Sequence, residues 1–263
     1  IRYGDGMSRF DKLKAKAESQ NDVMSYYDNL IYSEIINDPS SSGHILQLHD
    51  FLTNSKENRF CSYDDRIRRT KNKFSLSLND TLMSQGTHSL INWKGLSVYK
   101  SAYDLVIYSM LLQEISPEVI IEYGSGSGGS AIWMADMLSV TNMNFKPDGK
   151  IYSYDIKKPE CDHDMIEFIE LDLTESREWH WQEGRKLVIE DAHVNITEVL
   201  LQTDNMLESG DYLIVEDSGT VEKQKSISEF LQNAKNTYEI DQYYLDFFGM
   251  NVGSCVDSIF KVK

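Results

Sequence analysis

The chain has 263 residues, of which 41% are hydrophobic and 26% charged, and its formal net charge at pH 7 is −16. This length allows one large or two small domains with a buried core. The negative charge disfavours a nucleic-acid partner, because it repels a phosphate backbone. We expect no membrane-spanning segment, since the apolar runs are too short to cross a bilayer.

The start of the chain and its cysteines suggest where the protein acts. The three cysteines are isolated and form no CxxC motif, which is typical of a reducing cytoplasm. No signal-peptide pattern is seen at the beginning, so we expect a cytoplasmic location. Because the first residue is Ile1, we expect either a trimmed chain or a domain of a larger polypeptide, and both alternatives stay open.

Residues 1–90 are polar and only weakly periodic. Between residues 23 and 36, apolar side chains recur at helical spacing, which predicts one or two amphipathic helices. The stretches DPSSSGH at 38–44 and LTNSKENRFCSYDDR at 52–66 are typical of loops. We interpret residues 1–90 as an N-terminal appendage of helices and loops, acting as a lid or as a contact in a homo-oligomer.

Residues 91–263 form the predicted catalytic domain, in which strand and helix patterns alternate. Helices are expected at 102–115, 129–140, 196–210 and 226–235, strands at 118–124, 150–156, 165–173, 186–192 and 211–218, and an antiparallel pair at 243–249 and 257–263. This order predicts an α/β fold with a doubly wound, mostly parallel sheet. Ligands of such sheets bind at the carboxyl ends of the strands, near the point where the strand order reverses.

The stretch VIIEYGSGSGGSAIWMADML at 119–138 is typical of a strand, a glycine-rich turn and a helix. Its glycines match G-x-G-x-x-G, a pattern that by itself is compatible with several ligands. Glycines allow a sharp turn and a close approach to backbone amides, and the positive end of the helix attracts an anion. The candidate ligand-binding residues of this turn are Gly124, Ser125, Gly126, Gly129 and Ser130.

Three acids near strand ends favour S-adenosylmethionine as the ligand of this turn. Glu122 precedes the first glycine, where a carboxylate suits the amino group of the ligand and would repel a pyrophosphate. Asp155 ends the next strand and can accept both hydroxyls of a ribose. Asp172 follows the third strand and can accept from the adenine amino group, although a solvated loop acid is an equal alternative. Asp155 would serve NAD as well.

A second group of acids follows the next two strands. Glu190, Asp191 and His193 come after one strand, and Glu216 and Asp217 come after the following one. Because parallel strands end at the same edge, four carboxylates would crowd beside a histidine, which is costly unless protons or a cation neutralise them. Oxygen ligands select a hard cation, so we predict Mg²⁺ or Mn²⁺ at these four acids, with Ca²⁺ also possible. The histidine can then act as a general base. The alternative is that the acids cap the following helices.

From about Trp93 onward, the chain resembles a known family. In WKGLSVYKSAYDL, Trp93, Gly95, Lys100 and Asp104 match the pattern of the cephalosporin hydroxylase/rhamnosyl O-methyltransferase family. The resemblance continues through IIEYGSGSGGSAIWMADML, IEDAHVN and DYLIVEDS. It covers about two thirds of the chain, and one departure is the absence of the prolines common between Trp93 and Asp104.

The resemblance implies a class I methyltransferase-like Rossmann fold and Mg²⁺-dependent methyl transfer from S-adenosylmethionine. It implies that Glu190, Glu216 and Asp217 hold the metal and that His193 is the general base. The family usually has aspartate where this chain has Glu190, and Asp191 stands beside it, so either acid can be the ligand.

We therefore predict an O-methyltransferase acting on a hydroxyl of a sugar or another small polar natural-product intermediate. Nitrogen and carbon acceptor atoms stay open. One alternative is an NAD-dependent oxidoreductase using the same glycine turn, although hydride transfer has no need of the paired acids. The other is a non-catalytic α/β binding module, for which the acids and the histidine would have no purpose.

Overall fold

The computed structural model describes residues 59–71, 90–141, 149–175 and 181–263. All of them belong to one compact unit, Lys56–Lys263. The amphipathic helices predicted between residues 23 and 36 lie outside the described residues. Within the described part of the chain, no helix combines the length and the hydropathy that a membrane crossing requires.

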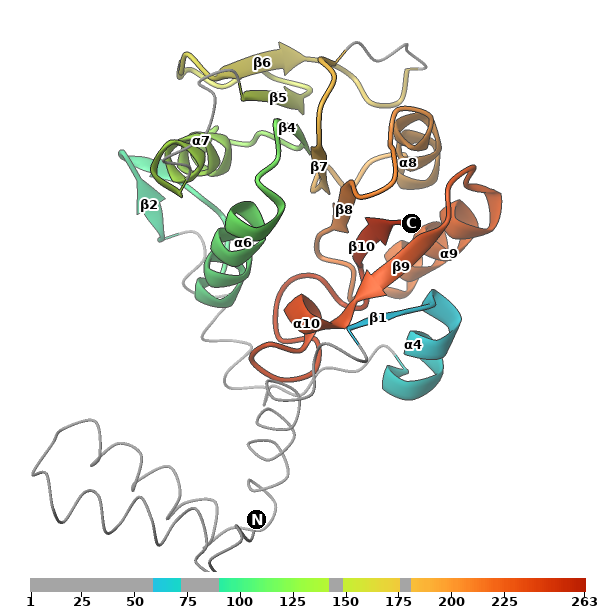
Figure 1. Ribbon diagram of the computed structural model, residues 1–263. Coiled ribbons are helices and arrows are strands. Elements are labelled where there is room, and N and C mark those ends of the chain that lie inside the picture. Colours follow the sequence, from blue (N-terminus) through green and yellow to red (C-terminus); the bar gives the residue numbers. More distant parts are fainter. Residues whose placement is uncertain (1–58, 72–89, 142–148, 176–180) are drawn as a thin grey trace, which may run out of the picture. The chain divides into compact units, whose positions relative to one another are not determined.

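An eight-stranded sheet forms the centre of the described unit (Figure 1). Its order is β1-β9-β10-β8-β7-β4-β5-β6. The strands are β1 (Phe60–Cys61), β4 (Val119–Tyr123), β5 (Lys150–Asp155), β6 (Ile166–Glu170), β7 (Lys186–Glu190), β8 (Tyr212–Val215), β9 (Tyr238–Asp241) and β10 (Ile259–Val262). From β6 to β8 the pairing is parallel, whereas β10 is antiparallel to both β8 and β9. The predicted doubly wound, mostly parallel sheet is confirmed.

Helices cover both faces of the sheet, with α6 and α7 on one face and α8 and α9 on the other (Figure 1). The helices are α4 (Tyr63–Thr70), α6 (Ala102–Ile115), α7 (Gly129–Thr141), α8 (Ile196–Asp204), α9 (Val221–Asn233) and α10 (Gln242–Leu245). A short hairpin of β2 (Asn92–Trp93) and β3 (Leu96–Ser97) forms a separate two-stranded sheet. The chain runs from β4 outward through β5 to β6 and then returns to β7 on the other side of β4. The strand order therefore reverses between β4 and β7, which is where such sheets bind ligands.

The central strands are apolar along their whole length, because helices cover them on both sides. Val119, Ile120 and Ile121 of β4 are fully buried, and every residue of β8 is buried. The start of α6 is fixed locally by a capping box, in which Ser101 and Asp104 each bond to the other's backbone. Burial of this sheet gives the strand ends fixed positions, and the site is built on them.

The predicted antiparallel pair of 243–249 with 257–263 is wrong in its first strand, although the last strand, β10, is antiparallel to its neighbours. Residues 243–245 belong instead to the short helix α10, and the strand that pairs with β10 is β9, just before that helix. The helix starts there because the Asp241 side chain accepts a hydrogen bond from the Tyr243 amide. The side chains of Tyr238 and Ile240, two residues apart, are both buried, as expected for one face of a strand.

Residues 59–71, within the predicted appendage, are attached to the edge of the sheet. Phe60 and Cys61 pair with Asp241 and Ile240, and α4 follows directly, so the loop predicted at 52–66 contains a strand and the start of a helix. Ser62 caps α4 by accepting from the Asp65 amide. The predicted domain boundary at residue 90 stays a prediction.

Arg66 of α4 is the most deeply buried cation of this attachment, with 1% of its surface exposed. Its guanidinium donates to Asp257 at 2.6 Å, to Asp246 at 2.5 and 2.6 Å, and to Asn251 at 2.9 Å. Asp257 is fully buried. This network connects α4 to the segment between α10 and β10.

We expect Arg66→Met to destabilise the protein by about 3–5 kcal/mol, because it leaves the carboxylate of Asp257 buried without its cationic partner. Arg68→Met is the matched control on the same helix: Arg68 is 74% exposed and pairs with Asp65, so its loss should cost less than about 1 kcal/mol. Urea unfolding followed by circular dichroism measures both. Equal losses for the two variants would contradict the assigned role of the buried network.

Candidate active site

A cavity of about 410 Å³ lies at the carboxyl ends of the parallel strands. The strand register explains why the predicted residues meet there, since Tyr123, Glu190 and Val215 form one row across β4, β7 and β8. The residues that follow this row open into the cavity. The predicted residues that line it are Gly124, Ser125, Gly126, Ser130, Asp155, Asp172, Asp191, His193, Glu216 and Asp217. Glu122, Gly129 and Glu190 do not line it.

The glycines of the turn allow neighbouring backbone segments to pack closely against it. Gly124 has φ +103°, and a Cβ there would stand 2.8 Å from the backbone of Asp191. A Cβ on Gly129 would stand 2.3 Å from the carbonyl oxygen of Ser97. Gly126, with φ +51°, has open space around it, and its amide donates to Asp155 at 2.9 Å. Two of the three motif glycines therefore allow close approach of the neighbouring backbone.

Glu122 lies beneath the turn and is fully buried. Its carboxyl accepts hydrogen bonds from the hydroxyls of Ser130 and Ser153. Burial is the main cause that raises the pKa of Glu122 above its ordinary value. In this position the side chain supports the turn from below. Its predicted contact with the donor stays a prediction.

Asp155 and Asp172 lie on the β5 and β6 side of the cavity. Asp155 is oriented by the amide of Gly126, and Asp172 accepts from the amide and hydroxyl of Thr174 at 2.9 and 2.7 Å. Apolar side chains border the same part of the cavity, and one of them, Ile156, is 71% exposed. A carboxylate beside an exposed apolar side chain suits a nucleoside, whose ribose is polar and whose base has apolar faces.

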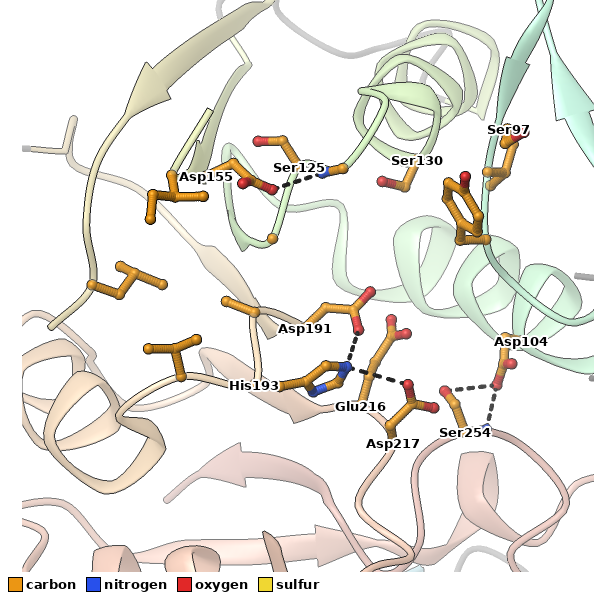
Figure 2. Close-up of a pocket in the computed structure, with 18 of the residues that line it drawn as sticks. Ser97, Asp104, Ser125, Ser130, Asp155, Asp191, His193, Glu216, Asp217 and Ser254 are labelled. Carbon is orange, nitrogen blue, oxygen red and sulfur yellow. Dashed lines mark hydrogen bonds and ion pairs between the residues drawn. The ribbon is translucent and has the colours of Figure 1, made fainter. Parts of the chain in front are cut away.

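On the β7 and β8 side of the cavity, acids from two neighbouring strand ends lie beside His193 (Figure 2). Nε2 of His193 lies 3.4 Å from Oδ2 of Asp217 and 3.6 Å from Oδ1 of Asp191. One ligand atom from each of these three side chains lies within 4.8 Å of the others, which is a spacing that a metal ion can bridge. Glu216 lines the same cavity next to Asp217.

Lys100 is a buried cation behind these acids, and sequence reasoning assigned it no chemical role. Its Nζ lies 2.9 Å from Oδ2 of Asp191 and 2.7 Å from Oε1 of Glu216. The hydroxyl of Tyr108 donates to the same Glu216 oxygen. Burial, and then the charge of Asp191, raise the pKa of Glu216 well above its usual range.

Glu190 is separated from the other acids and held by a second buried lysine. Its Oε1 accepts from the amide of His193 at 2.8 Å. Its Oε2 has no well-aligned hydrogen bond within the described residues, and it lies 3.0 Å from Nζ of Lys223. Glu190 therefore supports the backbone at His193 and forms a buried ion pair, and Asp191 is the acid of this stretch that faces the cavity.

The ring of His193 is contacted from both sides. Nζ of Lys223 lies 2.5 Å from Nδ1, while Nε2 faces the carboxylates. The Asp217 carboxylate is the largest influence on this ring and raises the pKa of His193 above its ordinary value, against opposing effects of burial and of Lys223. With the Lys223 ammonium donating to Nδ1, a neutral ring carries its proton on Nε2.

Asp104 and Ser254 close the cavity on the side of α6 (Figure 2). Oδ1 of Asp104 accepts from the amide of Ser254 at 2.8 Å, while Oδ2 takes part in the capping box of α6. One buried carboxylate thus joins the start of α6 to the segment before β10. Sequence reasoning noted Asp104 only as part of a pattern, and Ser254 had no recognisable signal.

Comparison with known proteins agrees with this geometry. The profile of the family "Rhamnosyl O-methyltransferase/CmcI" matches residues 85–250. The chain belongs to this family. It is 31% identical over 136 residues to a rhamnosyl O-methyltransferase of Mycobacterium leprae and 28% identical over 137 residues to one of Mycobacterium tuberculosis. Each match covers 48% of this chain, and 59% and 56% of those proteins, so the chain spans little more than half of their length.

Solved structures of CmcI have the same fold. The structure described as "cmcI-D160 Mg-SAM" has a TM-score of 0.54 and 24% identity, covering 66% of this chain and 77% of that one. The structure described as "cmcI-N160 SAH" also has a TM-score of 0.54, with 23% identity, covering 72% and 92%. The resemblance stated from the sequence is confirmed, and the fold is that of class I methyltransferases.

We expect Gly124→Ala to destabilise the family's glycine turn far more than Gly126→Ala. Both positions have positive φ, which costs an L-residue about 1–2 kcal/mol. Only at Gly124 would the added Cβ stand 2.8 Å from backbone atoms, so the free energy of unfolding of this variant should fall by about 3 kcal/mol or more in total. Thermal and urea unfolding measure the difference. Similar losses at the two positions would show that the close contact with Asp191 does not constrain the turn.

Proposed function

We propose that this protein is a metal-dependent O-methyltransferase that transfers the methyl group of S-adenosylmethionine to a hydroxyl of a small polar acceptor. The observation that carries the proposal is the meeting of Asp191, His193 and Asp217 in one cavity with the glycine turn and Asp155. Membership of the rhamnosyl O-methyltransferase/CmcI family supports it.

The donor is proposed to lie along the glycine turn. Backbone amides of the turn would bind its carboxylate, and Asp155 would accept hydrogen bonds from its ribose hydroxyls. Asp172 lines the same cavity and would accept a hydrogen bond from the adenine amino group. A net negative site also suits the sulfonium, which is a cation. The negative charge of the site favours S-adenosylmethionine over NAD, whose pyrophosphate the acids would repel, whereas Asp155 would serve either ligand.

The acids fit a hard divalent cation, because carboxylate oxygens are the ligands that Mg²⁺ and Mn²⁺ prefer. We propose Asp191, Glu216 and Asp217 as its ligands, rather than Glu190, because these three line the cavity and Glu190 does not. A bound Mg²⁺ would supply charge that orients acceptor oxygens and lowers the pKa of an acceptor hydroxyl.

His193 is proposed as the general base. With the donor bound, the acceptor oxygen would attack its methyl carbon, the carbon–sulfur bond would break to leave a neutral thioether, and Nε2 would take the hydroxyl proton. Nε2 can accept only when Nδ1 carries the ring proton, so the Lys223 ammonium must then pair with Glu190 instead of Nδ1. Oε2 of Glu190, 3.0 Å from Nζ of Lys223, is in position to receive it.

The acceptor is proposed to be a sugar hydroxyl or a related vicinal diol, as the names of the curated relatives suggest. The predicted roles of residues 1–90 as a lid or oligomer contact, and the cytoplasmic location, stay predictions. The acidic chain disfavours nucleic acid as a partner.

We expect S-adenosylhomocysteine to raise the melting temperature of the protein, and NAD at the same concentration to leave it unchanged. A ligand that binds only the folded state stabilises it by mass action. Asp155→Asn should weaken the S-adenosylhomocysteine effect by about tenfold in affinity, because it loses a charged acceptor for the ribose. Glu170→Gln, at the end of β6 and outside the cavity lining, is the control. A shift with NAD alone would favour the oxidoreductase alternative.

We expect His193→Ala to lower kcat for methylation by about 10²–10⁴-fold, the usual contribution of a general base. Its affinity for S-adenosylhomocysteine should change by less than about threefold, since the ring lies on the β7 side of the cavity and apart from Asp155 on the β5 side (Figure 2). The assay uses a panel of sugars and small alcohols with labelled donor, with and without Mg²⁺. Turnover that is equal in the two proteins would exclude His193 as the base. Absence of turnover in the parent, with partner binding altered by the substitution, would favour the non-catalytic alternative.

A further inference from the structure

We propose that the Lys100 ammonium is a fixed counter-charge that sets how tightly the carboxylates of the cavity bind a divalent cation. The inference rests on the proposed function and deepens it. It concerns a side chain that is not itself among the proposed ligands.

The contacts of Lys100 are unusual for a lysine. The side chain is 3% exposed, and its Nζ lies within 2.9 Å of two carboxylates that come from neighbouring strand ends. The Tyr108 ring lies 5.7 Å from Nζ on another side. A fully desolvated ammonium is costly unless it is paired, so these two carboxylates keep it in place as a charge.

Lys100 lies behind the acids and does not compete for the space in front of them. Asp191 and Glu216 line the cavity, whereas Lys100 does not. The two oxygens of Asp191 divide their contacts, since Oδ2 faces Lys100 and Oδ1 faces His193. Both oxygens of Glu216 lie within 2.8 Å of Nζ, so an ion in the cavity would share the Glu216 carboxylate with the ammonium and bind Asp191 through its other oxygen, Oδ1.

The formal charges match one divalent cation. Glu190 is neutralised separately by Lys223, which leaves Asp191, Glu216 and Asp217 against the single charge of Lys100. Carboxylates must be ionised to bind a metal, and the neutral ring of His193 adds no charge, so the metal-binding form of the site carries two negative charges. Without Lys100 the three acids would carry three negative charges. One divalent cation would not neutralise them fully, and it would be attracted more strongly.

Two effects of Lys100 on ion binding oppose each other. Its charge repels a divalent cation a few ångströms away, while its hydrogen bonds hold two proposed ligands in position. In a partly buried site, the repulsion between a unit charge and a divalent ion exceeds the net contribution of a hydrogen bond several-fold. Charge therefore decides the sign, and Lys100 weakens ion binding.

The test is isothermal titration calorimetry of metal-free protein with Mn²⁺ and with Mg²⁺, which needs no turnover. Lys100→Met should bind Mn²⁺ about tenfold more tightly or better than the parent. Lys94→Met is the matched control, because it removes the same charge from a lysine that is 56% exposed and paired with Asp136. Its affinity should equal that of the parent. Unchanged or weaker binding by Lys100→Met would overturn the inference.

A second variant separates charge from ligand geometry and guards against misfolding. Lys100→Gln removes the charge but keeps a side-chain N–H donor and leaves all three proposed ligands in place. Its affinity for Mn²⁺ should also exceed that of the parent. Binding no tighter than that of the parent would mean that the charge does not decide the affinity, which overturns the inference.

The failure of the proposed metal site gives a different result. If the parent itself binds neither Mn²⁺ nor Mg²⁺, the metal dependence in the proposed function fails, and the inference fails with it. If the parent binds an ion and Lys100→Met has the same affinity, only the role of Lys100 is wrong.

Discussion

The pairing of Lys100 with Asp191 and Glu216 is the interaction on which the site depends. A parallel sheet brings the ends of neighbouring strands together, so acids that follow β7 and β8 are forced into the same small volume. Like charges at such distances destabilise the fold unless they are neutralised. Buried lysines supply part of that neutralisation from within the protein, and the acids facing the cavity retain their attraction for cations.

The same logic organises the molecule beyond the cavity. Asp104 joins the start of α6 to Ser254, and Arg66 joins α4 to Asp246 and Asp257. In each case one buried charged group bonds to the segment between α10 and β10, which also buries Val252, Cys255 and Val256. The cavity wall between α6 and β10 is therefore held by polar and apolar contacts together, whereas its floor is held by the apolar strands.

The patterns in the sequence were sufficient for the order of the elements. Apolar runs defined β4, β7 and β8, because central parallel strands are buried on both faces. The error at residues 243–249 has a local cause: an apolar, aromatic stretch is compatible with a strand, and only the cap from Asp241 makes it begin as a helix. The strand and helix within 59–71 were missed because their partners, Asp241 and Asp257, lie far along the chain.

By itself, the sequence determined the family through its motifs. It also determined the doubly wound sheet and the gathering of acids and a histidine at one edge, because strand periodicity and parallel order suffice to place residues at strand ends; the residues are Glu190, Asp191, His193, Glu216 and Asp217. Only the tertiary structure decided which way neighbouring acids turn. Glu190 faces Lys223 and Glu122 faces two serines, while Asp191 faces the cavity. The lysines that make this choice lie on α9 and in the segment before α6, and no spacing within the sequence predicts that they reach the same strand ends.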